Sequence, residues 1–252
     1  MKVIFVTPCF NASKNLNTLY TSLQEQKNDN WSVWFVDDIS TDDTWEEIQK
    51  LCSKDNRNFS SHSIIATTKS IVWDGTCGIK NTEKKFALRN IIDVARQFED
   101  HDDIVIATVD GDDSLCNPNT VGMILREYEK NAEVVWTAHR WDINGLNISK
   151  PIPDNVDPYL WPWSSSHLRT FKANLLKNIS DDNFKDLDGN WFKRGYDQAL
   201  MLPLIKKSKK NVYIPEVCYQ YNINSVSVND RDWAEMNQLS TINMVRARGF
   251  IE

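Results

Sequence analysis

The sequence lacks paired cysteines and long apolar runs. Its five cysteines are an odd number, are widely scattered and include no Cys-x-x-Cys pair, which argues against a disulfide framework or a zinc knuckle and is typical of reduced thiols in a cytosol. No apolar stretch approaches the roughly 20 residues needed to span a bilayer, and the apolar N-terminus is too short for a signal peptide. We therefore expect a cytoplasmic protein without an integral membrane segment, which leaves peripheral membrane association open.

The chain also lacks an excess of positive charge and any internal repeat. Its net charge of −6 argues against non-specific binding to nucleic acid or to an anionic membrane. Hydrophobic residues make up 41% and charged residues 25% of the chain, which is ordinary for a globular protein. No low-complexity tract or linker divides the 252 residues, so we expect one domain over residues 1–252.

Short apolar segments alternate with amphipathic segments along most of the chain. The expected strands are 3–6, 33–36, 64–66, 104–109, 134–136 and 212–214. Helices are expected after Ser13, after Ser40 or Thr41, over 83–98, from Asn117-Pro118, over 168–178, over 196–209 and from about Asp232. The proline- and tryptophan-rich stretch 141–166 is expected to be a long functional loop. This order predicts a Rossmann-like α/β fold, with a mostly parallel central sheet and helices on both faces.

An acidic cluster, Asp110-Gly111-Asp112-Asp113, follows the apolar segment 104–109. Three carboxylates in four residues repel one another, and a hard cation such as Mg²⁺ or Mn²⁺, which prefers oxygen ligands, would remove that cost. The alternative is an ordinary acidic turn in which Gly111 supplies a positive φ. The cluster alone does not decide between a metal site and a turn.

Polar residues follow two further expected strands. The first ends in Thr7-Pro8-Cys9-Phe10-Asn11 and the second in Asp37-Asp38. In a parallel sheet these ends share one edge with the acidic cluster, where ligands bind in open α/β folds. A planar base could stack on Phe10, Asp38 could accept a hydrogen bond from a base N–H, and a metal could hold phosphates. This constellation favours a nucleoside diphosphate ligand.

The order and spacing of these motifs resemble family-2 glycosyltransferases with the GT-A fold. The segments 3–11 and 35–44 are similar to the family's opening strand with Pro-x-aromatic-Asn and to its Val-Asp-Asp-x-Ser-x-Asp-x-Thr motif, and the acidic cluster to Asp-x-Asp-Asp. Weaker matches are Ala87-Leu88-Arg89-Asn90, Gly195-Tyr196-Asp197-Gln198, and Tyr219-Gln220-Tyr221 followed by Ser225 and Ser227. The resemblance covers most of the chain and is strongest over residues 1–115.

The resemblance implies an enzyme of the hexosyltransferase type that transfers a sugar with inversion from a nucleoside diphosphate sugar, most often a UDP-sugar, to an acceptor hydroxyl. Residues 1–115 would bind the donor and residues 116–252 the acceptor, which would be a glycan, a lipid-linked sugar or a protein. Mn²⁺ or Mg²⁺ would be the cofactor, held by Asp110, Asp112 and Asp113 together with the phosphates. Asp110 would meet the ribose or a metal-bound water, and either Asp112 or Asp113 would be the main ligand.

The same resemblance assigns further residues to the donor site and to catalysis. Asp197 would be the general base, although a carboxylate at the start of a helix is favourable without any catalytic role. The donor-site residues implied or considered are Pro8, Phe10, Asn11, Asp38, Lys84, Arg89, Asp110, His167 and Arg169. Arg89 could instead pair with an acid on its own helix. His167 and Arg169 could receive a phosphate at a serine-rich helix start, or could belong to an ordinary helix cap.

Two departures from the family pattern stand out. Tyr196 occupies the position before Asp197 where the family usually has Glu, and no histidine follows Tyr221, where some relatives have a metal ligand. A catalytically degenerate nucleotide- or sugar-binding relative is therefore the alternative function. A sugar nucleotidyltransferase is disfavoured because residues 7–13 contain no glycine to cradle a triphosphate. A phosphoacceptor receiver domain would be about half as long and would carry its acidic pair after the first strand.

Overall fold

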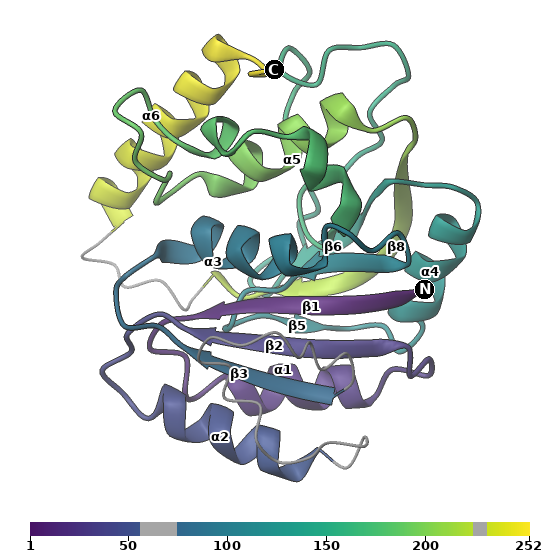
Figure 1. The fold of residues 1–252 in the computed structure, drawn as a ribbon. Coiled ribbons are helices and arrows are strands. Elements are labelled where there is room, and N and C mark those ends of the chain that lie inside the picture. Colours follow the sequence, from purple (N-terminus) through teal and green to yellow (C-terminus); the bar gives the residue numbers. More distant parts are fainter. Residues whose placement is uncertain (56–74, 224–230) are drawn as a thin grey trace.

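The computed structural model describes residues 1–55, 75–223 and 231–252. Eight strands form one sheet in the order β3-β2-β1-β4-β7-β6-β8-β5. Their bounds are β1 Lys2–Cys9, β2 Trp31–Asp37, β3 Gly75–Lys80, β4 Ile104–Thr108, β5 Ser114–Leu115, β6 Val134–Trp141, β7 Arg169–Lys172 and β8 Asn211–Tyr221. The sheet runs through the middle of the molecule (Figure 1).

The sheet changes character halfway across. On one side β3, β2, β1 and β4 are all parallel to one another. On the other side β7 runs antiparallel to both β4 and β6, whereas β6 and β8 are parallel. The short strand β5 pairs antiparallel with β8. The predicted fold class, an α/β fold with a mostly parallel sheet, is confirmed.

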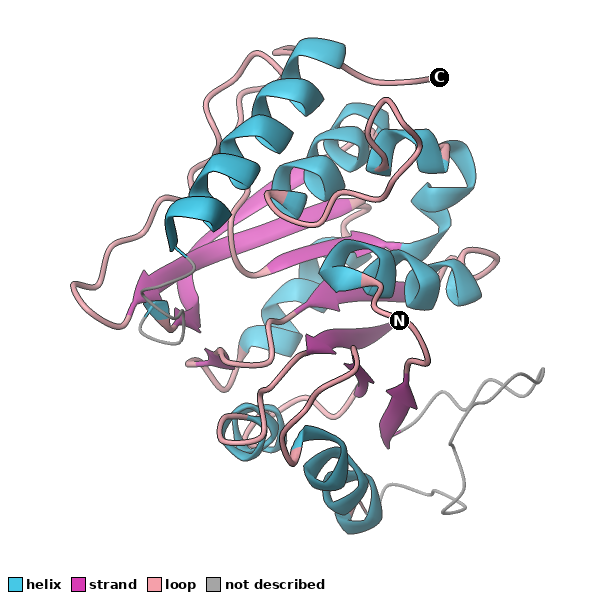
Figure 2. Ribbon diagram, turned by 90° about the vertical axis from the view of Figure 1, so that its left-hand side faces the viewer, coloured by secondary structure: helices cyan, strands magenta, loops and turns pink. Residues whose placement is uncertain are grey.

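Helices cover both faces of the sheet, as Figures 1 and 2 show from two sides. The α-helices are α1 Leu16–Gln24, α2 Thr44–Lys54, α3 Phe86–Ala95, α4 Thr120–Glu129, α5 Tyr196–Lys207 and α6 Arg231–Arg248, and short 3-10 helices span Arg96–Phe98, Ala173–Asn178 and Asp181–Phe184. Alternate residues of a strand point to opposite faces. In β1, Ile4 and Val6 join the apolar cluster beneath α3 and α5, whereas Val3 and Phe5 join the cluster beneath α1, α2 and α4.

Several expected elements differ from the observed ones. The segment 168–178 is not a helix but strand β7 followed by a 3-10 helix, because its backbone pairs with β4 and β6. Ser13, Ser40, Thr41 and Asn117-Pro118 do not cap helices, since α1, α2 and α4 begin two or more residues later, with Asn15, Asp43 and Asn119 at their N-caps. β3 was not expected, and the expected strand 64–66 lies outside the described residues.

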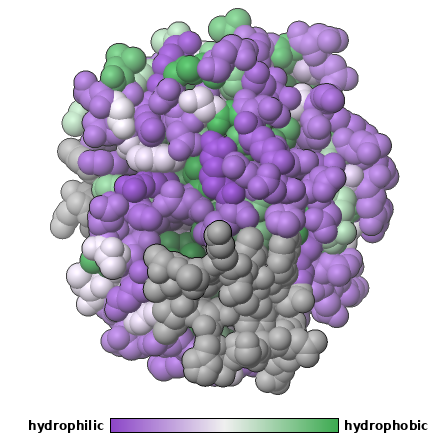
Figure 3. All heavy atoms as spheres, in the orientation of Figure 1, coloured by the Kyte–Doolittle hydropathy of each residue, from purple (hydrophilic) through white to green (hydrophobic). Residues whose placement is uncertain are grey.

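Within the described part of the chain, no helix combines the length and the apolar character that crossing a bilayer requires. The face drawn in Figure 3 is mainly hydrophilic, with hydrophobic side chains scattered rather than gathered in one large area.

Candidate functional site

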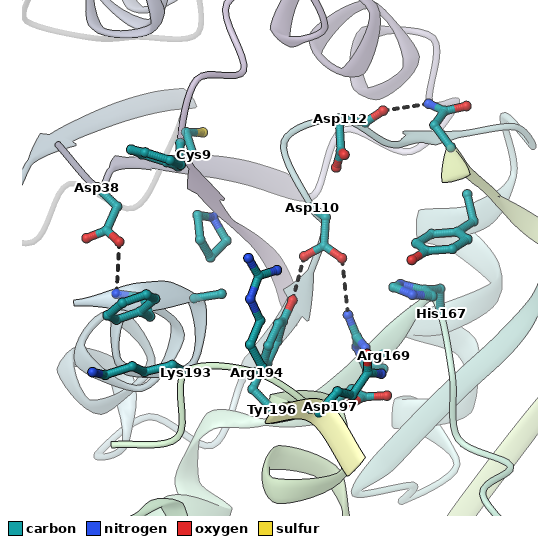
Figure 4. A pocket seen from close by; sticks show the side chains of 18 of the residues that line it. Cys9, Asp38, Asp110, Asp112, His167, Arg169, Lys193, Arg194, Tyr196 and Asp197 are labelled. Carbon is teal, nitrogen blue, oxygen red and sulfur yellow. Dashed lines mark hydrogen bonds and ion pairs between the residues drawn. The ribbon is translucent and has the colours of Figure 1, made fainter. Parts of the chain in front are cut away.

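One pocket lies where the ends of β1, β2 and β4 meet the start of α5. It encloses about 400 Å³. Its lining includes nine of the residues singled out from the sequence, namely Pro8, Phe10, Asp38, Lys84, Asp110, Asp112, His167, Arg169 and Asp197. Figure 4 shows Asp38 on one side and Asp112 and His167 on the other, with Asp110, Arg194 and Tyr196 between them. Side chains from six regions of the chain therefore converge, as the parallel-sheet argument predicts.

Asp38 forms one end of this pocket and is 3% exposed. Its Oδ1 accepts hydrogen bonds of 2.8 Å from the Asn81 side chain and the Lys85 backbone N–H, and its Oδ2 accepts one of 2.8 Å from the Phe86 N–H. Burial alone would raise the pKa of Asp38, but these donors outweigh burial and lower the pKa. The Lys84 ammonium lies 3.5 Å from Oδ2. Asp38 is therefore a charged carboxylate that also fixes the start of α3.

Phe10 presents an apolar surface beside Asp38. Its side chain is 53% exposed. The Lys84 ammonium lies 3.0 Å from the centre of the Phe10 ring, over one face. The ring is therefore accessible to a flat ligand while a cation is held next to it.

Asn11 does not line the pocket. Its Oδ1 accepts a hydrogen bond of 2.8 Å from the Thr41 N–H, and its own N–H donates to Ser40 Oγ at 3.0 Å. Ser13 Oγ likewise donates to Asp42 at 2.7 Å. Asn11 and Ser13 thus tie the loop after β1 to the loop after β2, and they shape the pocket rather than contact its interior.

The acidic cluster follows β4 and divides into exposed and buried members. Asp110 and Asp112 line the pocket, whereas Asp113 lies beneath it at 1% exposure. Burial and the nearby charges of Asp110 and Asp112 raise the pKa of Asp113 to about 9. Asp113 still accepts hydrogen bonds of 2.7 Å from the Tyr219 hydroxyl and the Asn222 N–H. These donors orient the Asp113 carboxyl group, but they do not offset the effect of burial and of the two neighbouring carboxylates on its negative charge.

Gly111 is not at a positive φ, unlike five other glycines of the described residues. A Cβ at this position would lie 3.3 Å from the Ala12 Cβ and 3.4 Å from the Pro8 carbonyl oxygen. The absence of a side chain therefore lets the acidic cluster pack against the end of β1. The alternative of a turn glycine with positive φ is wrong.

Asp110 is held by two side chains from distant parts of the chain. The Tyr196 hydroxyl donates to Asp110 Oδ1 at 2.6 Å, and an Arg169 guanidinium nitrogen lies 3.7 Å from Oδ2 (Figure 4). Arg169 is the first residue of β7 and is 1% exposed, with its Nε donating to Thr108 Oγ1 at 3.1 Å. Arg169 is therefore placed by a strand and not by a helix start, which corrects the sequence expectation.

Asp197 lies in the first turn of α5, next to Tyr196. Burial raises the pKa of the Asp197 carboxyl, with Asp110 adding to the effect, whereas Arg169 and backbone N–H groups act in the opposite direction. The side chain lies beside Arg169 at the pocket wall (Figure 4). A carboxylate in this setting is more basic than an exposed one, which is the property that a general base requires.

His167 lines the opposite wall and is 8% exposed. Its imidazole stacks on the ring of Tyr219, with 4.7 Å between the ring centres, and on that of Tyr221, with 4.8 Å. Burial lowers the pKa of His167 well below its usual value, and the positive charge of Arg169 acts in the same direction. The ring is therefore a neutral imidazole at neutral pH.

Sequence reasoning missed part of the pocket lining. Lys193 and Arg194 line the pocket just before α5, and Arg194 points between Asp38 and Asp110 (Figure 4). Gly195 makes this turn with a φ of +62°. A Cβ at this position would lie only 2.9 Å from the Gln238 carbonyl oxygen of α6, so no side chain fits there. The sequence Lys193-Arg194-Gly195 directly before α5 was the signal that could have predicted these two cations in the pocket. Arg89, by contrast, lies outside the pocket lining, 3.2 Å from Glu83.

Comparison with known proteins finds one matching family model and several similar solved structures. The family model described as glycosyl transferase family 2 matches residues 4–70. No curated protein gives a significant match. Similar solved structures include TarS 1-349 of S. aureus in complex with UDP, with a TM-score of 0.61 and 17% identity over 96% of this chain and 66% of that one.

Two other solved structures bind nucleotide sugars. The complex of TarS 1-349 with UDP-GlcNAc has a TM-score of 0.61 and 16% identity over 100% of this chain and 68% of that one. The mannosyltransferase PcManGT of Pyrobaculum calidifontis, in complex with GDP-Man and Mn²⁺, has a TM-score of 0.62 and 14% identity over 98% and 63%. The chain thus spans about two thirds of the length of these proteins. Over residues 4–70 the chain matches glycosyl transferase family 2, and the shared architecture shows that its fold is of the GT-A type.

Proposed function

We propose that the chain transfers a sugar from a nucleoside diphosphate sugar, with a UDP-sugar as the first choice, to an acceptor hydroxyl, in a metal-dependent reaction that inverts the anomeric carbon. The observation that carries this proposal is the convergence of Asp38, Asp112 and Asp197 on one pocket from three separate elements. Each would serve a different part of the donor or the reaction.

The nucleoside would occupy the Phe10 end of the pocket. The exposed ring of Phe10 offers a stacking surface, and the Asp38 carboxylate has about four acceptor positions, three of which are filled by protein N–H groups. At most one position is left for a base N–H. The similar proteins bind UDP, UDP-GlcNAc and GDP-Man, which supports a nucleotide sugar as donor and leaves the choice of base to experiment.

The acidic cluster fits a divalent cation. Burial, together with the charges of Asp110 and Asp112, raises the pKa of Asp113 to about 9. A cation would compensate these negative charges, and carboxylate oxygens are the ligands that Mn²⁺ and Mg²⁺ prefer. Asp110, Asp112 and Asp113 would hold the cation. When bound, it supplies positive charge for the leaving diphosphate, an effect worth several kcal/mol.

The chain also offers cations of its own around the pocket. Lys84, Lys193 and Arg194 line the pocket, and Arg194 points toward its centre. Their positive charges would stabilise the negative charge that develops on the diphosphate as it departs. Arg89, held by Glu83 on the surface, would not take part.

Asp197 would act as the general base. It would take the proton of the acceptor hydroxyl while the acceptor oxygen bonds to the anomeric carbon and the bond from that carbon to the diphosphate breaks. Removal of such a base typically costs 10²- to 10⁴-fold in rate. Residues 1–115 would supply the donor side and residues 116–252 the acceptor side. The acceptor class is a glycan, a lipid-linked sugar or a protein.

The decisive experiment compares Asp197→Asn with Asp100→Asn in a transfer assay with a panel of sugar acceptors. Asp100 is a suitable control because its side chain is 84% exposed and pairs with Lys177 on the surface. We expect Asp197→Asn to bind UDP normally and to transfer at least about a hundredfold more slowly. Near-normal transfer by Asp197→Asn would remove this residue from the mechanism.

A thermal-shift panel of UDP- and GDP-sugars with Mn²⁺ tests the donor. A donor at one hundred times its dissociation constant should raise the free energy of unfolding by about 2.7 kcal/mol. Tyr196, which stands where the family usually has Glu and hydrogen-bonds Asp110, keeps open the alternative of a degenerate relative, although the intact acidic cluster argues against it. That alternative predicts stabilisation by a nucleotide sugar without any release of the nucleoside diphosphate.

A further inference from the structure

A histidine belongs to the carboxylate cluster at the pocket wall. Among the described residues, Asp110, Asp113 and His167 form a group whose potential ligand atoms all lie within 4.8 Å of one another. Two ligands on opposite sides of a first-row divalent cation lie about 4.2 Å apart. The three atoms are therefore close enough that side-chain movements would bring all of them into contact with one ion.

The His167 side chain has the features of a ligand. Its Nδ1 is buried and has no hydrogen-bond partner within the described residues. Leaving such a nitrogen unpaired costs free energy, and buried polar groups without a partner call for an explanation. The nearby His139 does not share this property, since its Nδ1 lies 3.1 Å from Ser149 Oγ and its Nε2 accepts from Trp141 Nε1 at 3.2 Å.

The three side chains are oriented by other residues. Tyr219 is central, because its ring stacks on His167 while its hydroxyl donates to Asp113 Oδ2 at 2.7 Å. Tyr221 stacks on His167 as well, and Tyr196 holds Asp110 at 2.6 Å. Outer residues that orient metal ligands in this way typically change metal affinity 10- to 100-fold when they are mutated.

We propose that His167 is a nitrogen ligand of the divalent cation and binds it together with Asp110 and Asp113. The inference rests on the proposed function in that a cation occupies this end of the pocket. Such a site differs from the all-carboxylate site expected from the sequence, in which Asp112 was a ligand and His167 was not. Three protein ligands would leave the other positions of a six-coordinate ion to phosphate oxygens and water.

A nitrogen ligand also predicts metal preference. Imidazole suits later first-row metals, whereas Mg²⁺ favours oxygen ligands alone. The site should therefore bind Mn²⁺ and Co²⁺ more tightly than Mg²⁺. Substitution of His167 should reduce the difference between the affinity for Mn²⁺ or Co²⁺ and the affinity for Mg²⁺.

The test is pulsed electron paramagnetic resonance of Mn²⁺ bound to the protein, with and without UDP. We expect modulation from a ¹⁴N nucleus in the wild type and its loss in His167→Phe, a variant that keeps a flat ring between the two tyrosines. Mn²⁺ affinity should fall at least about 10-fold in His167→Phe, while Mg²⁺ affinity changes less. If this variant fails to fold, His167→Asn replaces it.

His139→Phe provides the control, because the His139 ring centre lies only 5.7 Å from that of His167. Nitrogen modulation that persists in His167→Phe but vanishes in His139→Phe would overturn the proposal. Stoichiometric Mn²⁺ binding without any nitrogen signal would also overturn it, while the metal-dependent function would stand. No Mn²⁺ binding, together with transfer that resists a chelator, would overturn both.

Discussion

Asp38 after β2 and Asp113 after β4 are both buried carboxylates, 3% and 1% exposed, yet their surroundings differ in kind. Three N–H donors surround Asp38 and lower its pKa, whereas burial and two neighbouring carboxylates raise the pKa of Asp113 to about 9. The protein itself compensates the charge of Asp38. For Asp113 the compensation is left to a proton or a bound cation, and this is the end of the pocket at which we propose a metal.

The largest effect on stability is expected from Asp38→Ala. It leaves the N–H groups of Lys85 and Phe86 and the Asn81 amide without their acceptor, and we expect a loss of about 3 kcal/mol in the free energy of unfolding at pH 7. Because the pKa of Asp38 is lowered in the folded state, this contribution is present above the usual Asp pKa and is lost as pH falls through the folded-state value.

Urea unfolding at several pH values measures this loss. Asp38→Asn keeps the shape of the side chain and should cost less than Asp38→Ala. If both variants were as stable as the wild type, the donors around Asp38 would not be what distinguishes it from Asp113.

The next effect is stabilisation by Mn²⁺. At one hundred times its dissociation constant, Mn²⁺ should raise the free energy of unfolding by about 2.7 kcal/mol. The affinity should be greater at pH 8 than at pH 6, because a cation must displace a proton from Asp113, whose pKa is raised to about 9. Calorimetric titration at the two pH values checks this, and an affinity independent of pH would contradict the role given to Asp113.

Asp113→Asn should have a smaller effect, of opposite sign to that of Asp38→Ala. In the metal-free wild type, the raised pKa of Asp113 contributes stability at low pH that is lost as pH rises toward about 9, since only the folded state holds the proton there. A neutral Asn avoids this loss. We expect Asp113→Asn to be more stable than the wild type by at least about 1 kcal/mol at pH 8 in the presence of a chelator.

Thermal or urea unfolding across pH 5 to 9 tests the prediction, with Asp100→Asn as the control. At pH 5 the wild type and Asp113→Asn should unfold at nearly the same denaturant concentration. A variant that is less stable than the wild type throughout would show that Asp113 is held charged by its surroundings, as Asp38 is.

The smallest effect is expected from Tyr196→Phe, which removes the hydroxyl that donates to Asp110 at 2.6 Å. One hydrogen bond to a charged group contributes about 1.5 kcal/mol, and the partly exposed pocket reduces that value to about 1 kcal/mol. Tyr213→Phe, which removes the hydroxyl that accepts from Asn147 at 3.3 Å, is the matched control. Equal losses in the two variants would mean that Tyr196 gives Asp110 no special support.

The parallel half of the sheet was largely predictable, because each motif directly follows an apolar strand. β1, β2 and β4 were expected from uninterrupted apolar runs, and the residues after them do reach one pocket. β3 was missed since Gly75–Lys80 contains two glycines and few large apolar residues. Its strand character comes from parallel pairing with β2 over Ser32–Asp37.

The antiparallel half was less predictable. Leu168, Phe171 and Leu175 follow the spacing of a helix face, yet Arg169–Lys172 forms β7, because it lies between the free edges of β4 and β6. Ser225 and Ser227, part of the family resemblance, lie outside the described residues. Local periodicity cannot predict a strand such as β7, whose conformation depends on pairing with neighbouring strands.

The sequence by itself determined the α/β class, the acidic cluster and the residues that follow each parallel strand, because hydrophobic periodicity and turn chemistry are local properties. Only the tertiary structure decided that Tyr196 reaches Asp110, that Arg194 enters the pocket and that His167 stacks between two tyrosines beside Asp113. Those contacts join residues far apart in the chain. Their geometry depends on how β7, β8 and α5 pack, which no local pattern encodes.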